Sequence, residues 1–195
     1  MDTICSGCGL AVPGGTPACR LIFDDYIAGE WNNPISYRYH RMFVDTYCLQ
    51  HPDQFCASAK SFAAHLTGLC AAFEHKSHPS VLNAVNRWLS GNPSLTKPEL
   101  PSFRGALTIA VVQAQVQAEV EAKVQAEVQV KVQAKVQPEV QAEVREEVQA
   151  AAAQAEQNPF PIAQAIDRWA RSTWEAYSSL HHQARLWINQ SFSGK

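Results

Sequence analysis

A four-residue repeat fills the middle of the chain and strongly limits what the chain can fold into. From Val112 the sequence reads VQAQ VQAE VEAK VQAE VQVK VQAK VQPE VQAE VREE VQAA, ten tetrads that each begin with valine. The alternation of apolar and polar residues would suit a β-strand, but a strand that long lies far outside the normal range. A helix fits better, because Ala, Gln, Glu and Lys are good helix formers. Pro138 should interrupt that helix.

The spacing of the valines also bears on what the repeat can do. A step of four residues turns by about 40° on a helix of 3.6 residues per turn, so the valine stripe winds around the helix. A coiled-coil seam needs a period of 3.5 residues instead. We therefore expect residues 111–157 to form a low-complexity insert that is helical in pieces and largely solvated. The alternative is a rod through which the chain self-associates or binds a partner.

The segments on either side of the repeat have a different composition. Every cysteine, histidine and aromatic residue lies outside residues 104–159. Apolar residues at helical spacing predict helices at 18–30, 36–51, 58–76 and 80–90, and one long helix from Pro161 through Trp187. The expected fold is all-α. Residues 1–110 supply an N-terminal zinc-knuckle-like loop and helices, and residues 158–195 complete the same bundle of about five helices.

Charge and cysteine content exclude several classes of protein. The net charge is −2 and only 17% of residues are charged, so no basic surface argues for nucleic-acid binding. No run of about 18 apolar residues predicts a membrane span. The N-terminal MDTICSGC lacks the basic start and apolar core of a secretory signal, so we expect a cytoplasmic location. There, six cysteines are more typical of thiols or metal ligands than of disulfides.

The stretch CSGCG at residues 5–9 has the form of a zinc knuckle. Cys5 and Cys8 would supply two thiolates, and the glycines would let backbone amides turn toward them. Zinc needs four ligands, so this motif is half of a site. A redox role for the pair would need a βαβ context that this sequence lacks.

The two first helices indicate where the other ligands lie. If 18–30 and 36–51 form an antiparallel hairpin, Cys19 and His51 lie about 18 and 22 Å from the turn, and so at the same end. His40 faces the same way as His51 but lies about 16 Å away along the helix. We therefore expect zinc to be bound by Cys5, Cys8, Cys19 and His51, with Cys48 as a substitute ligand. The other reading of Cys19 is a small buried apolar residue.

The remaining histidines allow a second kind of site. His40, Asp45, His65 and His182 are candidate catalytic residues, because inward histidines with a carboxylate could bind a metal or act as an acid–base unit. A simpler interpretation makes His40 and His65 hydrogen-bonded core residues and pairs Asp45 with Arg41 one turn earlier.

The chain resembles an uncharacterised bacterial family that is defined only as a domain of unknown function. The resemblance rests on CSGCG at 5–9, PACR around Cys19, HRMFVDTYCLQHP at 40–52, HLTGLC at 65–70, FRGALTIA at 103–110 and RWARSTWEAYSSLHHQARLW at 168–187. It implies no established activity, and it implies that the tetrads are an insertion in a normally short connection. It marks as motif positions Cys5, Cys8, Cys19, His40, Asp45, Tyr47, Gln50, His51, His65 and His182.

Three functional hypotheses follow. The first is a protein with a structural zinc site and an unidentified binding role. The second is a metal-dependent hydrolase or transferase that uses the bundle histidines and Asp45. The third is an interaction protein that works through the repeat.

Overall fold

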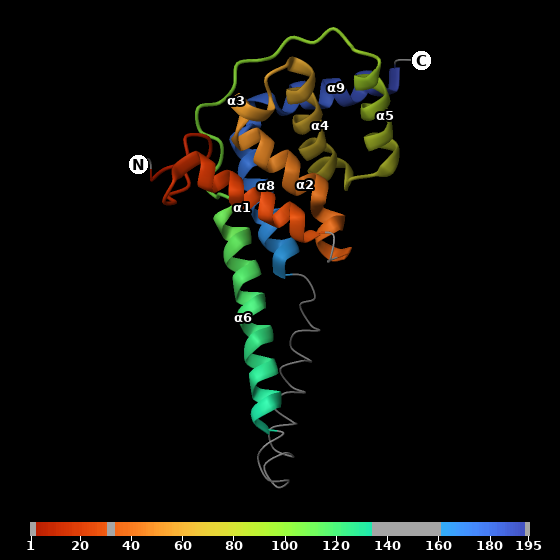
Figure 1. The fold of residues 1–195 in the computed structure, drawn as a ribbon. Helices are drawn as coiled ribbons and strands as arrows, with labels where there is room; N and C mark the ends of the chain where they lie inside the picture. The colour runs from red at the N-terminus through yellow and green to blue at the C-terminus, as the bar shows by residue number, and fades with distance from the viewer. Residues whose placement is uncertain (1–2, 31–33, 134–160, 194–195) are drawn as a thin grey trace.

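The computed structural model of the chain is all-helical (Figure 1) and describes residues 3–30, 34–133 and 161–193. These residues form eight α-helices and one 3₁₀ turn. Their only β-type pairing is an isolated bridge between Ile4 and Ala11. The prediction of an all-α fold is therefore confirmed. No helix in the described part of the chain is long and apolar enough to cross a membrane.

The helix boundaries lie close to those that the sequence predicts. The α-helices are α1 (Gly15–Glu30), α2 (Pro34–Gln50), α3 (Pro52–Phe55), α4 (Ala59–His75), α5 (Pro79–Ser90), α6 (Ala110–Gln133), α8 (Pro161–Ala176) and α9 (His181–Ser193). Four of them, α2, α3, α5 and α8, begin with proline, whose fixed φ and missing N–H suit the first turn of a helix. The short α3 has no counterpart among the predicted helices, because four residues are too few to show a periodic pattern.

Helix α2 lies at the centre of the bundle. It packs against α4 on one side and α8 on another, and α1 lies alongside it. The core has two parts. One joins the end of α2 to α4, α5 and α9, with Leu49, Phe62, Leu66 and Trp187 among its buried residues. The other joins α1, α2, α8 and the start of α6, with Phe23, Phe43, Tyr47 and Trp169.

The prediction of one long C-terminal helix is wrong. The helix stops at Ala176, and a 3₁₀ turn at Ser178–Leu180 precedes α9. Tyr177 is fully buried and its hydroxyl donates to the carbonyl of Leu49 at 2.6 Å. This anchor holds the chain at the bend, and α9 returns across α4 and α5. The bend therefore lets Trp187 pack in the core between α4 and α5. If α8 continued straight past Ala176, Trp187 would not reach this core.

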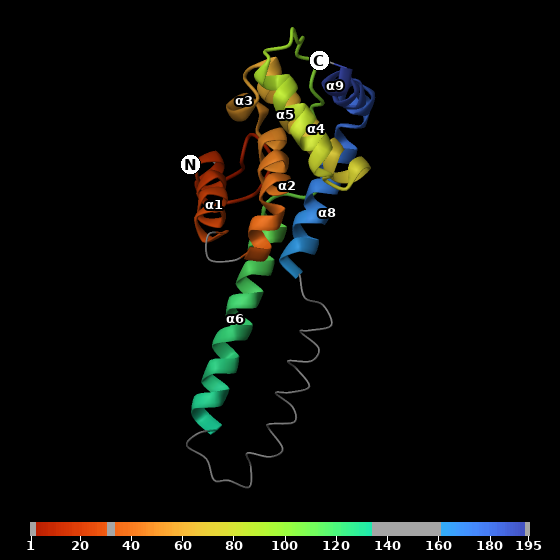
Figure 2. The ribbon, with the colours of Figure 1, turned by 90° about the vertical axis from the view of Figure 1, so that its right-hand side faces the viewer.

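Helix α6 projects from the bundle as a rod (Figures 1 and 2). Its first turns are anchored by Ile109 and Val112, which are each 1% exposed. Further out, Val120, Val124 and Val128 are more than half exposed. The tetrads are thus helical as far as Gln133. The valines from Val120 to Val128 are solvated, in agreement with the prediction for this part of the repeat. Pro138 and the later tetrads lie outside the described residues.

An extended segment connects α5 to α6 and runs over the bundle (Figure 1). The buried Gln50 side chain holds its end in place. Its Nε2 donates to the carbonyls of Arg104 and Leu107, at 3.1 and 2.8 Å, and its Oε1 accepts from the Trp169 indole at 3.0 Å. Gly105 has φ +118°, which favours glycine. The end of α2 is therefore tied to both α8 and the start of α6.

Candidate metal centre

The N-terminal residues form a tight turn around the two knuckle cysteines. The amide of Cys5 donates to the carbonyl of Leu10 at 2.8 Å, and the amide of Gly9 donates back to Cys5 at 2.9 Å. Gly9 has φ +76°, a conformation that glycine adopts without a Cβ clash. Backbone N–H groups of Gly7 and Cys8 point at the Cys5 sulfur. The turn therefore presents two sulfurs with amide donors around them, as a zinc knuckle does.

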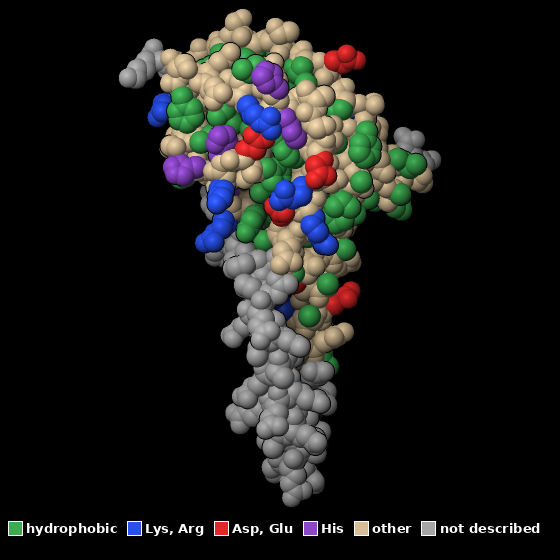
Figure 3. Space-filling view, turned by 180° about the vertical axis from the view of Figure 1, so that it is seen from behind, with side chains coloured by type: hydrophobic (Ala, Val, Ile, Leu, Met, Phe, Trp, Pro, Cys, Tyr) green, Lys and Arg blue, Asp and Glu red, His purple; other side chains and the backbone are tan. Residues whose placement is uncertain are grey.

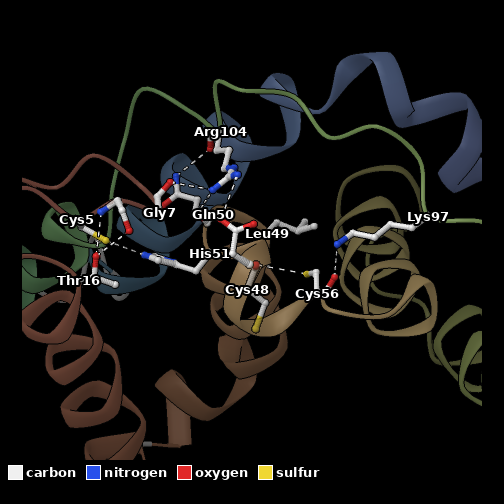
Figure 4. A network of polar contacts seen from close by, with 12 residues as sticks. Cys5, Gly7, Thr16, Cys48, Leu49, Gln50, His51, Cys56, Lys97 and Arg104 are labelled. Atoms are coloured by element: carbon white, nitrogen blue, oxygen red, sulfur yellow. Dashed lines mark hydrogen bonds and ion pairs between the residues drawn. The ribbon is translucent and has the colours of Figure 1, made fainter.

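Three separate segments bring four donor atoms together. Cys5 and Cys8 come from the turn, Cys19 from α1, and His51 directly follows α2. Their ligand atoms all lie within 4.8 Å of one another. His51 Nε2 lies 3.3 Å from Cys5 Sγ and 3.5 Å from Cys19 Sγ, and the sulfurs of Cys8 and Cys19 are 3.7 Å apart. Figure 4 shows the His51 ring directed at Cys5.

The spacing of the donor atoms matches a tetrahedral zinc site. Zn–S bonds of about 2.3 Å and a Zn–N bond of about 2.0–2.1 Å imply S···S edges of about 3.8 Å and S···N edges of about 3.6 Å. The S···S distance between Cys8 and Cys19 is 3.7 Å, the S···N distances from His51 to Cys5 and Cys19 are 3.3 and 3.5 Å, and the remaining donor pairs lie within 4.8 Å. The residues present therefore fit a metal ion in number, type and spacing.

Contacts outside the donor set fix the His51 ring. Its Nδ1 lies 2.8 Å from the Tyr47 carbonyl one turn earlier, so Nδ1 donates to that carbonyl and Nε2 is the nitrogen that faces the sulfurs. The Tyr47 ring stacks on the imidazole with centroids 4.0 Å apart. The Tyr47 hydroxyl donates to Cys19 Sγ at 3.8 Å. Tyr47 thus orients one ligand and contacts a second.

The N-terminal turn approaches the His51 ring so closely that residue 7 must be glycine. A Cβ at residue 7 would lie 3.0 Å from Cγ and Nε2 of His51 and closer still to Cδ2. The guanidinium of Arg104 lies above this contact (Figure 4), 3.4 Å from the carbonyls of Gly7 and Gln50. The glycines of CSGCG indicated a tight turn, but no sequence pattern indicated Arg104.

The cluster lowers the pKa of one thiol and raises the pKa of its neighbour. The pKa of Cys8 falls to about 4, because Cys19 donates a hydrogen bond to its thiolate, an effect that burial only partly opposes. That hydrogen bond and burial raise the pKa of Cys19. Burial lowers the pKa of His51, but contacts with the Cys8 thiolate and the Tyr47 carbonyl outweigh it and the pKa is raised. A metal cation would replace these shared protons, since thiolate is the form that binds metal.

Cys48 does not join the four donors. It is buried at 4% exposure, and burial raises its pKa to about 12. Figure 4 shows its sulfur pointing away from His51. Within residues 3–30, 34–133 and 161–193, no other group of three His, Cys, Asp or Glu side chains has the spacing of a metal site.

Asp45 and His65 form a hydrogen-bonded pair between α2 and α4. His65 Nδ1 donates to Asp45 Oδ1 at 2.8 Å, and Arg41 Nε lies 3.4 Å from the other oxygen. The two helices can approach closely because Gly68 has no side chain; a Cβ at residue 68 would collide with the Asp45 carboxylate. Burial raises the pKa of Asp45, although His65 and Arg41 oppose that shift. Both the His65 pairing and the Arg41 pairing considered from the sequence are therefore present.

His40 and His182 are not brought together with that pair. His40 is partly exposed on α2, and His182 is exposed on α9. Histidines gather near acidic and basic side chains on the face shown in Figure 3. The bidentate pair of Arg185 and Glu74, at 2.7 and 2.8 Å, joins α9 to α4. The described histidines outside the four-donor cluster do not form a metal centre with one another.

Comparison with known proteins places the chain in a family. Residues 3–136 match a family of unknown function, DUF5946, and since this range is more than half of the chain, the chain belongs to that family. The resemblance noted from the sequence is confirmed. The matched range contains all four donors, while α8 and α9 lie outside it. No curated protein and no solved structure matches the chain.

Proposed function

We propose that this member of a family of unknown function binds one Zn²⁺ through Cys5, Cys8, Cys19 and His51, and that the ion is structural. The observation that carries the proposal is the group of four protein donors, three of them buried and Cys8 partly buried, with ligand atoms within 4.8 Å of one another. Four protein ligands fill a tetrahedral shell, whereas a catalytic zinc keeps one position for water or substrate.

The donor set selects the metal. Three thiolates and one imidazole are soft and borderline donors, which favour zinc over magnesium, calcium or manganese. Iron is the main competitor for a tetrahedral sulfur site, and the mixed Cys₃His set is a common structural zinc shell. Thiol ligands also need a reducing compartment, so we place the protein in the cytoplasm.

The structural role follows from how little else holds the N-terminal turn. Among residues 3–14, Cys5 alone is buried. Outside the cluster, the side-chain hydrogen bonds of the turn are chiefly those of Ser6 with Thr16 at 3.0 Å and of Arg104 with the Gly7 carbonyl at 3.4 Å. Leu10 and Val12 pack against the core but are themselves only partly buried. A bound ion would join the turn, α1 and the end of α2 at one point. His51 is adjacent to Gln50, whose side chain bonds to the segment before α6 and to Trp169 of α8. The bound ion would therefore also stabilise these contacts.

The proposal is tested by metal analysis of protein purified under reducing conditions without added chelator. We expect one zinc per chain in the wild type and in Cys48→Ala, which removes a nearby buried thiol outside the cluster. Cys5→Ser and His51→Ala should lose the zinc. Metal-free wild-type protein, or zinc retained by both ligand variants, would reject the site.

The other two functions have weaker support. The Asp45–His65 hydrogen bond favours acid–base chemistry, yet the described residues give that pair no third metal donor. The projecting α6 favours a rod that binds a partner or a second copy. Loss of a catalysed reaction in His65→Ala would support the first alternative. A change of oligomeric state on deletion of residues 112–151 would support the second.

A further inference from the structure

The four proposed zinc ligands differ in their access to solvent. Cys5, Cys19 and His51 are 1%, 0% and 2% exposed, whereas Cys8 is only partly buried. Cys8 is therefore the sulfur that a small reagent in solution reaches first. Its sulfur lies 3.7 Å from the sulfur of the buried Cys19. A partly exposed cysteine beside a buried one is the arrangement of an attacking and a resolving cysteine.

We propose that Cys8 is an oxidation site, and that a hydroperoxide converts Cys8 and Cys19 to a disulfide and releases the zinc. This inference rests on the proposed zinc site and adds a regulatory reaction to it.

The reaction balances with one peroxide for each ion released. The Cys8 sulfur attacks the peroxide, an S–O bond forms as the O–O bond breaks, and the leaving oxygen takes up a proton to become water when the oxidant is hydrogen peroxide. The Cys19 sulfur then attacks the Cys8 sulfenic acid. An S–S bond forms, the S–O bond breaks, and the leaving hydroxide takes up a proton from solvent to become a second water. Two electrons pass from the two thiolates to the peroxide. Only Cys5 and His51 would remain as ligands, so the ion would dissociate.

The remaining contacts indicate what oxidation changes in the fold. A Cys8–Cys19 disulfide would keep the N-terminal turn attached to α1, where Ser6 and Thr16 also meet. The link through His51 to α2 would be lost with the ion. Oxidation would thus leave the end of α2 joined to the turn through the Arg104 contacts with the Gly7 and Gln50 carbonyls, without freeing the turn itself.

The other thiols are poor targets for the same reagent. Cys48, Cys56 and Cys70 are 4%, 0% and 0% exposed. Cys56 Sγ also donates to the carbonyl of Cys48 at 3.5 Å. The burial of all three confines the reaction to the cluster.

The test is stoichiometric treatment of the zinc-loaded protein with hydrogen peroxide. We expect one zinc released per chain, measured with a chromogenic chelator, while free thiols fall from the six of the sequence to four. In Cys48→Ala they should fall from five to three with the same zinc release. A dithiol reductant with added zinc should restore both values.

Peptide mapping identifies the disulfide. Thermolysin cleaves before apolar residues such as Leu10, which separates Cys5 and Cys8 from Cys19. A Cys8–Cys19 disulfide joins two peptides, and fragmentation assigns its sulfurs. A Cys5–Cys8 or Cys5–Cys19 disulfide, or zinc retained after peroxide treatment, would overturn the inference while leaving the zinc site intact. Purified protein without zinc would instead reject the proposed function itself.

Discussion

Replacement of Gly7 by alanine tests the geometry of the site without removing a ligand. The added Cβ would lie 3.0 Å from Cγ and Nε2 of His51 and nearer to Cδ2. Ordinary carbon–carbon contacts are about 3.5–4.0 Å. Relief of the 3.0 Å contacts alone therefore needs the ring or the turn to retreat by roughly 0.5–1 Å, and relief of the closer contact with Cδ2 needs more. Because the Tyr47 ring stacks on the imidazole at 4.0 Å, the ring has little room to move away.

The expected loss of zinc affinity in Gly7→Ala follows from how little a metal–ligand distance can change. Ligand distances in a working site stay within about 0.2 Å of their ideal values, which is less than the displacement forced by the methyl group. We expect zinc affinity to fall about 10–100-fold, the range found when groups that orient a ligand are altered. That loss corresponds to about 1.4–2.8 kcal/mol.

The assay is competition for zinc between the protein and a chromogenic chelator. Gly29→Ala is the matched control, since a Cβ at residue 29 would meet nothing within 4 Å, and its zinc affinity should equal that of the wild type. If Gly7→Ala binds zinc within twofold of the wild type, then His51 is not held against the turn as described.

Three further predictions concern the bundle. Gly68→Ala should lower the free energy of unfolding by about 1–3 kcal/mol, because the methyl group would collide with the Asp45 carboxylate; an unchanged denaturant midpoint would contradict this. Tyr177→Phe should destabilise by about 1–3 kcal/mol, since it removes the hydrogen bond that anchors the bend before α9, and equal stability of the two proteins would refute it. Arg185 lowers the pKa of Glu74 below its ordinary 4.5, so this pair should stabilise the fold above that pH and lose its effect as the pH falls through the lowered pKa. The stability difference between wild type and Glu74→Gln should therefore shrink from pH 6 to pH 3, and a difference that grows would show the opposite sign.

The proximity of the proposed ligands could be worked out before the structure was known. Helix lengths and a short connection place Cys19 and His51 at one end of a hairpin, and CSGCG supplies the turn that meets them. The same argument separates His40 from His51. It kept Cys48 as a substitute ligand, because whether Cys48 joins the site depends on which way its side chain points from the last turn of α2.

Features that depend on long-range packing could not be predicted. The bend at Tyr177 needs a carbonyl from α2 as partner, 128 residues away, while the local pattern continues as a helix. Gly68 looked like an ordinary residue of an amphipathic helix, yet it allows Asp45 to approach. Arg104 lies in a segment without any periodic pattern. The structural role of each of these residues depends on a neighbour that is distant in the sequence.

X-ray absorption at the zinc edge of the purified protein shows whether three thiolates and one imidazole bind a single zinc ion. We expect one zinc per chain with three sulfur atoms at about 2.3 Å and one nitrogen at about 2.0–2.1 Å. A shell made mainly of nitrogen and oxygen, or no zinc in fully reduced protein, would contradict it.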